Sequence, residues 1–348
     1  MTDSIRLAVD AMGGDLGPRV ALNAAYSLAN DRALECQLYG PFDVLAEFAP
    51  ISLSDSNETP CVHELDNGSR MVYHHAPEVV TMEDRPSQAL RHKQQSSMWL
   101  AVDAVRAGAA DAAISAGNTG ALMAMGRHLL KTFVGIDRPA IAKSIPTAKA
   151  DCLMLDLGAS VKCDSEHLIQ NALMGSVFME SVAGVENPRV ALLNIGSEEI
   201  KGNEQIRLAA ANLQANEALN FIGYIEGDQI YRGDADVVVC DGFVGNVALK
   251  VSEGVAQLMV QEMREAFVSS WYGRIVGRFA RPLLRKWRRQ FDPDRYNGAS
   301  FLGLQGPVIK SHGAADELAF RSALELACEQ VNSQVAGRIY RRFEQEPF

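Results

Sequence analysis

The sequence predicts an α/β protein whose helices cover a central β-sheet, and two patterns support this fold class. Short apolar runs of strand length alternate with longer amphipathic stretches of helical period along the chain. Five of the apolar runs are each followed by a short loop of glycine and small polar residues, and then by a helical pattern. The chain has 348 residues, of which 47% are apolar and 22% charged, so its composition excludes a mostly disordered protein.

The first expected strand covers Ile5–Val9, and its loop AMGGDLG leads to Pro18, a residue suited to the first turn of a helix. The second unit reads DAAIS, AGNTG and ALMAMGRHLLK, and the third reads LMLDLG, ASVKCDSE and HLIQNALMGSVFMESV. The fourth reads VALLNIGSEEIKGN and EQIRLAAANLQA, and the fifth reads DVVVC, DGFVGN and VALKVSEGVAQLMVQEM. The expected strands of these four units are Ala112–Ser115, Leu153–Leu157, Val190–Asn194 and Val237–Cys240.

The loops after these strands predict a binding site. In a parallel sheet, the loops that follow the carboxyl ends of the strands open on one edge, where ligands bind. We therefore expect all five loops to converge on one cleft. Glycine that merely permits tight turns is the alternative reading for any single loop.

Composition also excludes several classes of protein. The net charge of −10 argues against a general nucleic-acid binder, which needs excess Lys and Arg on its surface. No run approaches the roughly 18 uninterrupted apolar residues of a membrane span. The N-terminus lacks the basic start and apolar stretch of a signal peptide, so we expect a cytoplasmic protein. The six cysteines are scattered without a C-x-x-C pair, which predicts reduced thiols and no structural zinc site.

The sequence lacks the motifs that bind dinucleotides, nucleoside triphosphates or catalytic zinc. It also lacks the serine hydrolase motif. What remains are loops whose backbone N–H groups lie at helix N-termini, where phosphate binds readily. Gly13 and Gly14 allow the chain to approach an anion closely, and Asn118, Thr119 and Gly120 offer donors in a similar position. We therefore expect an anion site that needs neither a metal ion nor a cofactor.

Four basic residues lie on or just beyond such loops. Lys201, Lys250 and Lys310 are placed where an ammonium group could neutralise phosphate. His312 precedes a helical run, and the positive end of the helix dipole favours a neutral imidazole there. Surface solvation or helix capping is the alternative reading for each of them.

One segment departs from the α/β pattern. Residues 271–291 contain seven basic residues and no acidic one, and apolar residues recur among the arginines at helical spacing. Pro282 is expected to kink or end a helix there. Basic charge beside Trp, Phe and Leu is typical of a helix in a membrane interface, and a dimer-interface or solvated helix is the alternative. We expect one α/β domain over residues 1–348, from which an amphipathic helical segment, 252–296, protrudes.

Seven segments, in this order and spacing, resemble the bacterial phosphate acyltransferase family: VDAMGGDLGP, SAGNTGALMA, DRPAIA, LDLGASVKCDSEHL, VALLNIGSEEIKGN, CDGFVGNVALK and YNGASFLGLQGPVIKSHGAAD. The resemblance runs from about Asp10 to Ala315. It implies a three-layer α/β/α Rossmann-like sheet similar to isopropylmalate dehydrogenases and phosphotransacetylases, and a homodimer. It also implies synthesis of acyl-phosphate from long-chain acyl-acyl-carrier-protein and inorganic phosphate, for phospholipid synthesis.

The resemblance further implies a cytoplasmic enzyme that associates peripherally with the inner face of the cell membrane. There it would pass its product to a membrane acyl-phosphate:glycerol-3-phosphate acyltransferase. Trp271, Phe279, Leu283 and Trp287 are the expected membrane contacts. One position departs from the family pattern, because Lys162 stands where the family usually has Asp. This reversal of charge leaves the role of position 162 open.

The reaction that the resemblance implies assigns roles to the loop residues. Phosphate is already a nucleophile at neutral pH, so positioning and electrostatic stabilisation can supply most of the catalysis. Asn118, Lys201, Lys310 and His312 are the expected catalytic residues. The expected binding residues are Asp10, Gly13, Gly14, Asp15, Thr119, Gly120, Asp156, Asp241 and Asn246. For Asp10, Asp156 and Asp241, helix capping or loop closure is the alternative role.

A covalent route is not expected, and two other functions stay open. A covalent acyl-enzyme on Cys163 is not expected, because the sequence shows no basic partner for it and direct transfer needs no such step. A short-chain phosphotransacetylase-like enzyme that uses acyl-coenzyme A would have little need for the basic amphipathic segment. A non-catalytic scaffold docked on the membrane would have little need for the polar loops at the strand ends.

Overall fold

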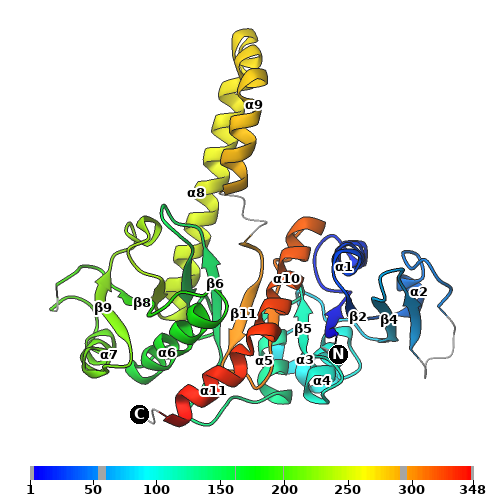
Figure 1. Ribbon diagram of the computed structural model, residues 1–348, viewed down its shortest axis with the longest axis horizontal. Coiled ribbons are helices and arrows are strands. Elements are labelled where there is room, and N and C mark those ends of the chain that lie inside the picture. Colours follow the sequence, from blue (N-terminus) through cyan, green and yellow to red (C-terminus); the bar gives the residue numbers. More distant parts are fainter. Residues whose placement is uncertain (1–3, 54–59, 161, 199, 291–295, 346–348) are drawn as a thin grey trace.

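The computed structural model describes residues 4–53, 60–160, 162–198, 200–290 and 296–345, without the side chains of 285–290. In this part of the chain, twelve strands form one sheet in the order β3-β4-β2-β1-β5-β12-β11-β6-β7-β10-β8-β9. Helices lie on both faces of the sheet, and a helical hairpin projects away from it (Figure 1). The expected α/β fold class is confirmed.

The first half of the sheet contains five strands that run parallel to one another: β1 (Ile5–Asp10), β2 (Leu34–Gly40), β4 (Arg70–His75), β5 (Ala112–Ser115) and β12 (Val308–Lys310). At the outer edge, β3 (Cys61–Glu64) pairs antiparallel with β4. The second half contains four parallel strands: β7 (Cys152–Leu155), β8 (Arg189–Leu193), β9 (Asn220–Ile225) and β10 (Val237–Val239).

Two strands join the halves and reverse the direction of the sheet. The pairings from β12 through β11 (Ala299–Leu302) and β6 (Ala140–Ile145) to β7 are all antiparallel. The second half therefore runs opposite to the first, and the expectation that all five loops leave one edge of a parallel sheet is wrong. The loops 146–151 and 303–307 are too short for a crossover, so they can join only antiparallel strands.

The helices form two layers around the sheet. One face is covered by α1 (Pro18–Asp31), α6 (Ser165–Ser181), α7 (Glu204–Ala215), α10 (Glu317–Ser333) and α11 (Val335–Gln345). The other is covered by α3 (Pro86–His92), α4 (Ser97–Arg106), α5 (Thr119–Leu129) and the start of α8 (Gly242–Val268). The two remaining short helices are α2 (Phe42–Leu45) and η1 (Ile230–Arg232). The three-layer arrangement is the expected one.

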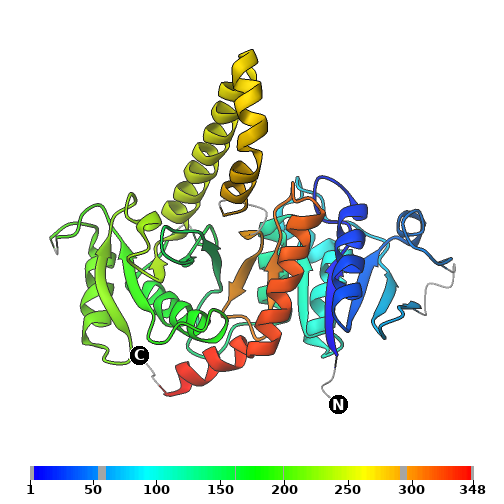
Figure 2. The ribbon, with the colours of Figure 1, turned by 45° about the horizontal axis from the view of Figure 1, so that its top comes forward.

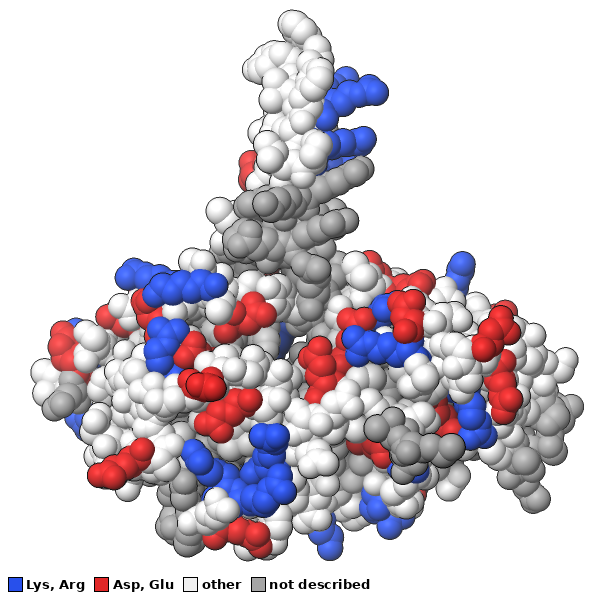
Figure 3. Space-filling view, viewed as in Figure 1, with Lys and Arg blue, Asp and Glu red and all other residues white. Residues whose placement is uncertain are grey.

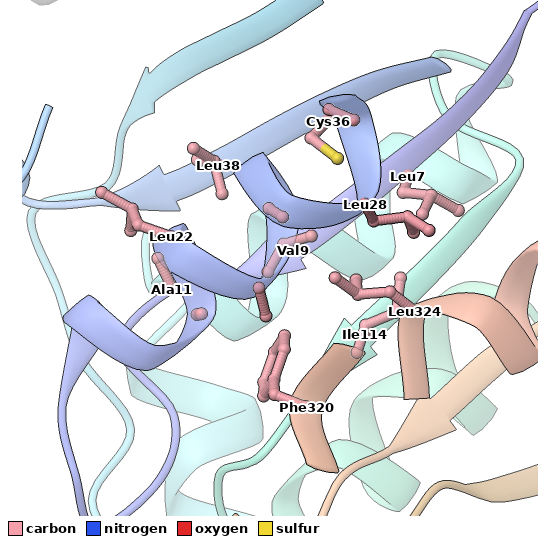
Figure 4. Close-up of a cluster of buried hydrophobic side chains, with 14 of the residues drawn as sticks. Leu7, Val9, Ala11, Leu22, Leu28, Cys36, Leu38, Ile114, Phe320 and Leu324 are labelled. Carbon is pink, nitrogen blue, oxygen red and sulfur yellow. The ribbon is translucent and has the colours of Figure 1, made fainter. Parts of the chain in front are cut away.

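Alternation along the strands explains why both faces are covered. In β1, Leu7 and Val9 pack among residues of α1 and α10, including Leu28 and Phe320 (Figure 4). Ala8 points to the opposite face. Burying a side chain such as Leu28 contributes about 1.5–3 kcal/mol relative to exposure. A strand that is apolar on both faces gains this stabilisation twice, which explains the near-continuous apolar runs in the sequence.

The hairpin consists of α8 and α9 (Trp271–Gln290), which pack against each other and project from the body on the side opposite the chain termini (Figures 1 and 2). α9 does not end at Pro282, which lies inside the helix. Its surroundings are exposed, so the carbonyl group that loses its backbone partner at the proline can bind water. None of the described helices is long and apolar enough to cross a membrane.

Candidate active site

Three loops of the first half meet beyond β1, β5 and β12. A Cβ atom on Gly13 would lie 2.5 Å from the backbone nitrogen of Gly117, so only glycine fits there. Gly14 has a φ of +98°, and its Cβ would lie 3.1 Å from the carbonyl oxygen of Gly313. The backbone N–H of Asp15 donates to the same oxygen at 2.7 Å. The structure therefore brings the two expected glycines together with the loop that carries His312.

Asp10 ends β1 and lies beneath these loops. Its carboxylate is buried and accepts hydrogen bonds from the Ser115 hydroxyl at 2.6 Å and the Met12 N–H at 3.2 Å. Burial raises the pKa of this carboxyl, and the hydrogen bonds and the charge of Lys310 oppose that rise. Asp10 thus ties β1 to β5 and supplies a carboxyl group beside Lys310.

Lys310 ends β12 and supplies a cation to this site. Its Nζ donates to the carbonyl oxygens of Ala116, at 3.1 Å, and Ser311. An ammonium group has three donors, so one remains for a ligand. Burial lowers the pKa of Lys310 to about 8, although the charges of Asp10 and Asp15 partly oppose the shift. Lys310 is therefore still mainly charged at neutral pH and can give up its proton easily.

His312 lies two residues further on. Its backbone N–H donates to Asn297 Oδ1 at 2.8 Å, and its Nδ1 accepts from the N–H of Ala314 at 3.2 Å. Partial burial lowers the pKa of the imidazole, and the charge of Lys250 lowers it further. A neutral ring whose Nδ1 accepts carries its proton on Nε2, so His312 presents a hydrogen-bond donor.

Asn118 begins α5 and holds two loops together. Its Oδ1 accepts from the Ala121 N–H at 3.1 Å, which is an N-cap. Its Nδ2 lies within 3.0–3.3 Å of the carbonyl oxygens of Thr81, Met82 and Asp84. These are the contacts of a capping residue, so the groups left for an anion are the backbone N–H groups of Thr119 and Gly120 in the first turn.

The expected site residues of the second half form a separate group at the start of α8. The Asp156 carboxylate accepts from the N–H groups of Gly158, Ala159 and Ser160 and from the Ser160 hydroxyl. Asp241 caps α8 by accepting from the N–H groups of Phe243 and Val244. Asn246 is exposed and lies beside Gly158. The two carboxylates therefore have the loop-closing and capping contacts of the alternative reading.

Lys201 lies in the loop between β8 and α7. Its Nζ pairs with Glu198 at 2.9 Å, and its carbonyl oxygen accepts from Asn194. The charges that act on Lys201 are those of Glu198 and Glu226. No contact among the described residues joins it to Lys310 or His312, so the structure does not bring these expected catalytic residues together.

Sequence reasoning missed two charged residues that act on His312, Lys143 and Glu253. Glu253, on the fourth turn of α8, pairs with Lys143 of β6 at 3.5 Å and with Lys250 at 2.9 Å. The charges of all three residues act on His312. The available signals were a lone lysine in the apolar strand AIAKSI and a Lys–Glu pair three residues apart in a helix.

The environment of Cys163 bears on the covalent route. The pKa of Cys163 is raised to about 12, chiefly by burial and then by the carboxylates of Asp156, Asp164 and Asp241. Its thiol is therefore a poor nucleophile, which fits direct transfer. The described residues contain no group of three or more His, Cys, Asp or Glu side chains placed to hold a metal ion.

Comparison with known proteins decides the family. A family model described as "Fatty acid synthesis protein" matches residues 5–338. The phosphate acyltransferase of Ectopseudomonas mendocina is 48% identical over 345 residues, which cover 97% of each chain. That of Halorhodospira halophila is 51% identical over 345 residues, covering 99% of this chain and 97% of its own. The chain belongs to the phosphate acyltransferase family. It is therefore an acyltransferase, and the resemblance seen in the sequence is confirmed.

Solved structures agree on the fold. A phosphotransacetylase from Streptococcus pyogenes matches with a TM-score of 0.64 and 13% identity, covering 95% of both chains. A branched-chain phosphotransacylase from Enterococcus faecalis matches with a TM-score of 0.54 and 16% identity, covering 94% of this chain and 99% of its own. At these identities the likeness concerns the fold alone, and it supports the expected phosphotransacetylase-like architecture.

Proposed function

We propose that this acyltransferase moves a long-chain acyl group from acyl carrier protein to inorganic phosphate. The observation that carries the proposal is the pair formed by Lys310 and His312 where the three glycine-bearing loops meet. A charged donor and a neutral donor there suit a phosphate dianion and a thioester carbonyl. Free carrier and acyl-phosphate, formed from acyl carrier protein and phosphate, would be the products to measure. Faster turnover with acyl-coenzyme A would favour the short-chain alternative.

The reaction can proceed in one direct transfer. A phosphate oxygen attacks the thioester carbonyl carbon, and the carbonyl oxygen becomes an oxyanion that the Nε2–H of His312 can stabilise. The C–S bond then breaks, and the thiolate leaves with the electron pair. Lys310, with a pKa of about 8, is matched to protonate a thiolate whose thiol has a pKa of about 8.5. Because a single oxyanion donor is worth roughly 3 kcal/mol, these groups can account for much of the catalysis.

Activity should need neither a metal ion nor a nucleotide, since lysines and helix N-termini can carry the phosphate charge. We expect acyl-phosphate formation to keep its rate after extensive chelation with EDTA. Loss of activity on chelation, restored by added Mg²⁺, would contradict this expectation.

Docking of the acidic carrier protein should depend on ionic strength. Lys162 is exposed and extends a basic charge at the position where the family usually has Asp, so we propose it as a carrier contact. Salt screens such exposed charges. We expect the KM for acyl carrier protein to rise between low and high salt, while the KM for an acyl-coenzyme A analogue changes less. Equal changes for both substrates would argue against electrostatic docking of the carrier.

The hairpin supports a peripheral membrane location on the cytoplasmic side. On α9, Trp271, Phe279 and Leu283 are 76%, 81% and 74% exposed. Basic side chains extend from one side of the hairpin, whereas the body carries mixed charges (Figure 3). The Trp287 side chain lies outside the described residues. We propose that the hairpin docks on the membrane, that the protein acts as a homodimer, and that a membrane acyl-phosphate:glycerol-3-phosphate acyltransferase takes up the product.

A further inference from the structure

We propose that Lys250, on the helix that follows β10 of the second half, is a phosphate ligand. Lys250 leaves its ion pair with the carboxylate of Glu253 and binds the incoming phosphate instead. This inference rests on the proposed function and deepens it. It adds a residue from α8 to the loops of the first half. The ligand class is a small oxyanion with two negative charges, which inorganic phosphate provides.

The ion pairs around Glu253 leave positive charge uncompensated. Among the described ion pairs, Glu253 is the carboxylate that pairs with Lys143 and also with Lys250. Two ammonium groups therefore share one carboxylate. Lys310 adds a third cation that acts on the same imidazole, although Asp10 and Asp15 partly balance it. A dianion would complete the charge balance better than Glu253 alone.

Burial separates the roles of the two lysines. The Lys143 side chain is 15% exposed, and burial lowers the pKa of its amine, while Glu253 opposes that shift. A largely buried ammonium group needs a fixed partner, so Lys143 holds Glu253 in place. The Lys250 side chain is 56% exposed, and its link to Glu253 is worth little in water. Lys250 can therefore leave Glu253 at low cost when phosphate arrives.

The position of Lys250 also suits this role. α8 is continuous from Gly242 to Val268, so Lys250 stands on a rigid element near its base rather than on a loop. Ala248 and Leu249 pack against the core of the sheet and fix the rotation of the helix at this point. The charge of Lys250 acts on both His312 and Lys310, so a phosphate held by Lys310 and His312 would also lie in the field of Lys250.

The test compares two variants whose expected effects have opposite signs. Lys250→Met should weaken inorganic phosphate binding at least ten-fold, and it should raise the phosphate KM by a similar factor. Glu253→Gln should tighten phosphate binding about three-fold, because it removes a competing negative charge. The KM for acyl carrier protein should stay within two-fold in both variants. Lys149→Met is the matched control, since Lys149 pairs with Asp234 in an exposed position outside the site.

Titration calorimetry with inorganic phosphate measures binding without turnover, and acyl-phosphate formation measures the KM. If Glu253→Gln lowers the melting temperature, the double variant Lys143→Met/Glu253→Gln also removes the largely buried charge that Glu253 balances. Phosphate binding by this double variant should be at least as tight as in the wild type, and weaker binding would count against the inference. Unchanged phosphate affinity in Lys250→Met, or equal weakening in both single variants, would overturn the inference. The variants could instead change phosphate binding as expected while the wild-type protein forms no acyl-phosphate. That result would refute the proposed function and leave the inference about Lys250 standing.

Discussion

Replacing Lys310 by methionine is expected to lower kcat/KM by about 10²–10³-fold, the usual effect of removing one preorganised group that stabilises transition-state charge. Lys310 supplies the partly buried ammonium group at the point where the loops after β1, β5 and β12 meet. Methionine keeps the apolar stem and removes the charge, so packing against β5 should change little. Steady-state kinetics with acyl carrier protein and phosphate would measure the loss, and circular dichroism would check the fold.

The pH profile offers an independent readout of the same residue. The pKa of Lys310 in the folded protein is about 8, below its usual value, because burial disfavours the charged form. The group is charged below that pH and neutral above it. Wild-type kcat/KM should therefore fall as the pH rises through about 8, and the residual activity of Lys310→Met should lack this fall. The same fall in the variant would assign the titration to another group.

Much of the fold could be predicted from the sequence because its strands are buried on both faces. All five expected strands are present, with ends that differ by at most two residues. The direction of the second half could not be predicted, since the pattern of strand, loop and helix is the same in either direction. β6 and β11 reverse the sheet, and neither was among the expected strands. Their polar residues, Lys143 and Ser300, interrupt the apolar run that would have revealed them.

The site was predicted only in part, because some of its residues follow local sequence patterns and others meet through contacts between distant parts of the chain. Glycines just before helices revealed the loops of Gly13 and Asn118. The backbones of these loops approach each other closely, which requires glycine at particular positions, and such positions are visible in the sequence. Lys143 and Glu253 form an ion pair between β6 and α8, although the two residues are 110 positions apart in the sequence. No local spacing predicts such a contact. Conversely, Asp156 and Asp241 follow strands as catalytic residues often do, yet local hydrogen bonds to their own loops account for them.

Replacing Phe279 and Leu283 by glutamate should abolish binding to anionic vesicles, with at least a ten-fold loss of affinity. Both side chains are exposed on α9, beside Arg278 and Arg281. Each basic residue near an anionic surface contributes about 1 kcal/mol, and shallow insertion of the apolar side chains adds to this. Two glutamates remove the apolar contact and introduce repulsion. Vesicle co-sedimentation at several fractions of anionic lipid would measure the effect.

Two controls separate the hairpin from general surface effects. The double variant Val134→Glu/Ile222→Glu adds the same charge at exposed apolar residues of the body and should bind vesicles like the wild type. Phosphate acyltransfer by Phe279→Glu/Leu283→Glu, measured without lipid, should also persist, because the hairpin projects away from the sheet (Figure 1). Loss of activity without lipid would instead indicate a role for the hairpin in the fold or in the dimer.

The competing interpretation is that the apolar side chains of α9 pack against a second copy of the chain. α8 also exposes apolar side chains along its length, including Val255, Leu258 and Met259, so a paired hairpin could bury both helices. Under that interpretation, Phe279→Glu/Leu283→Glu would dissociate the dimer, and vesicle binding would survive through the arginines. Under ours, the variant stays dimeric by light scattering and loses the vesicles. A homodimer presents two hairpins, so even a modest membrane affinity of each hairpin gives firm attachment through avidity. The variant loses the apolar contact in both hairpins, which is why we expect a large loss of vesicle binding.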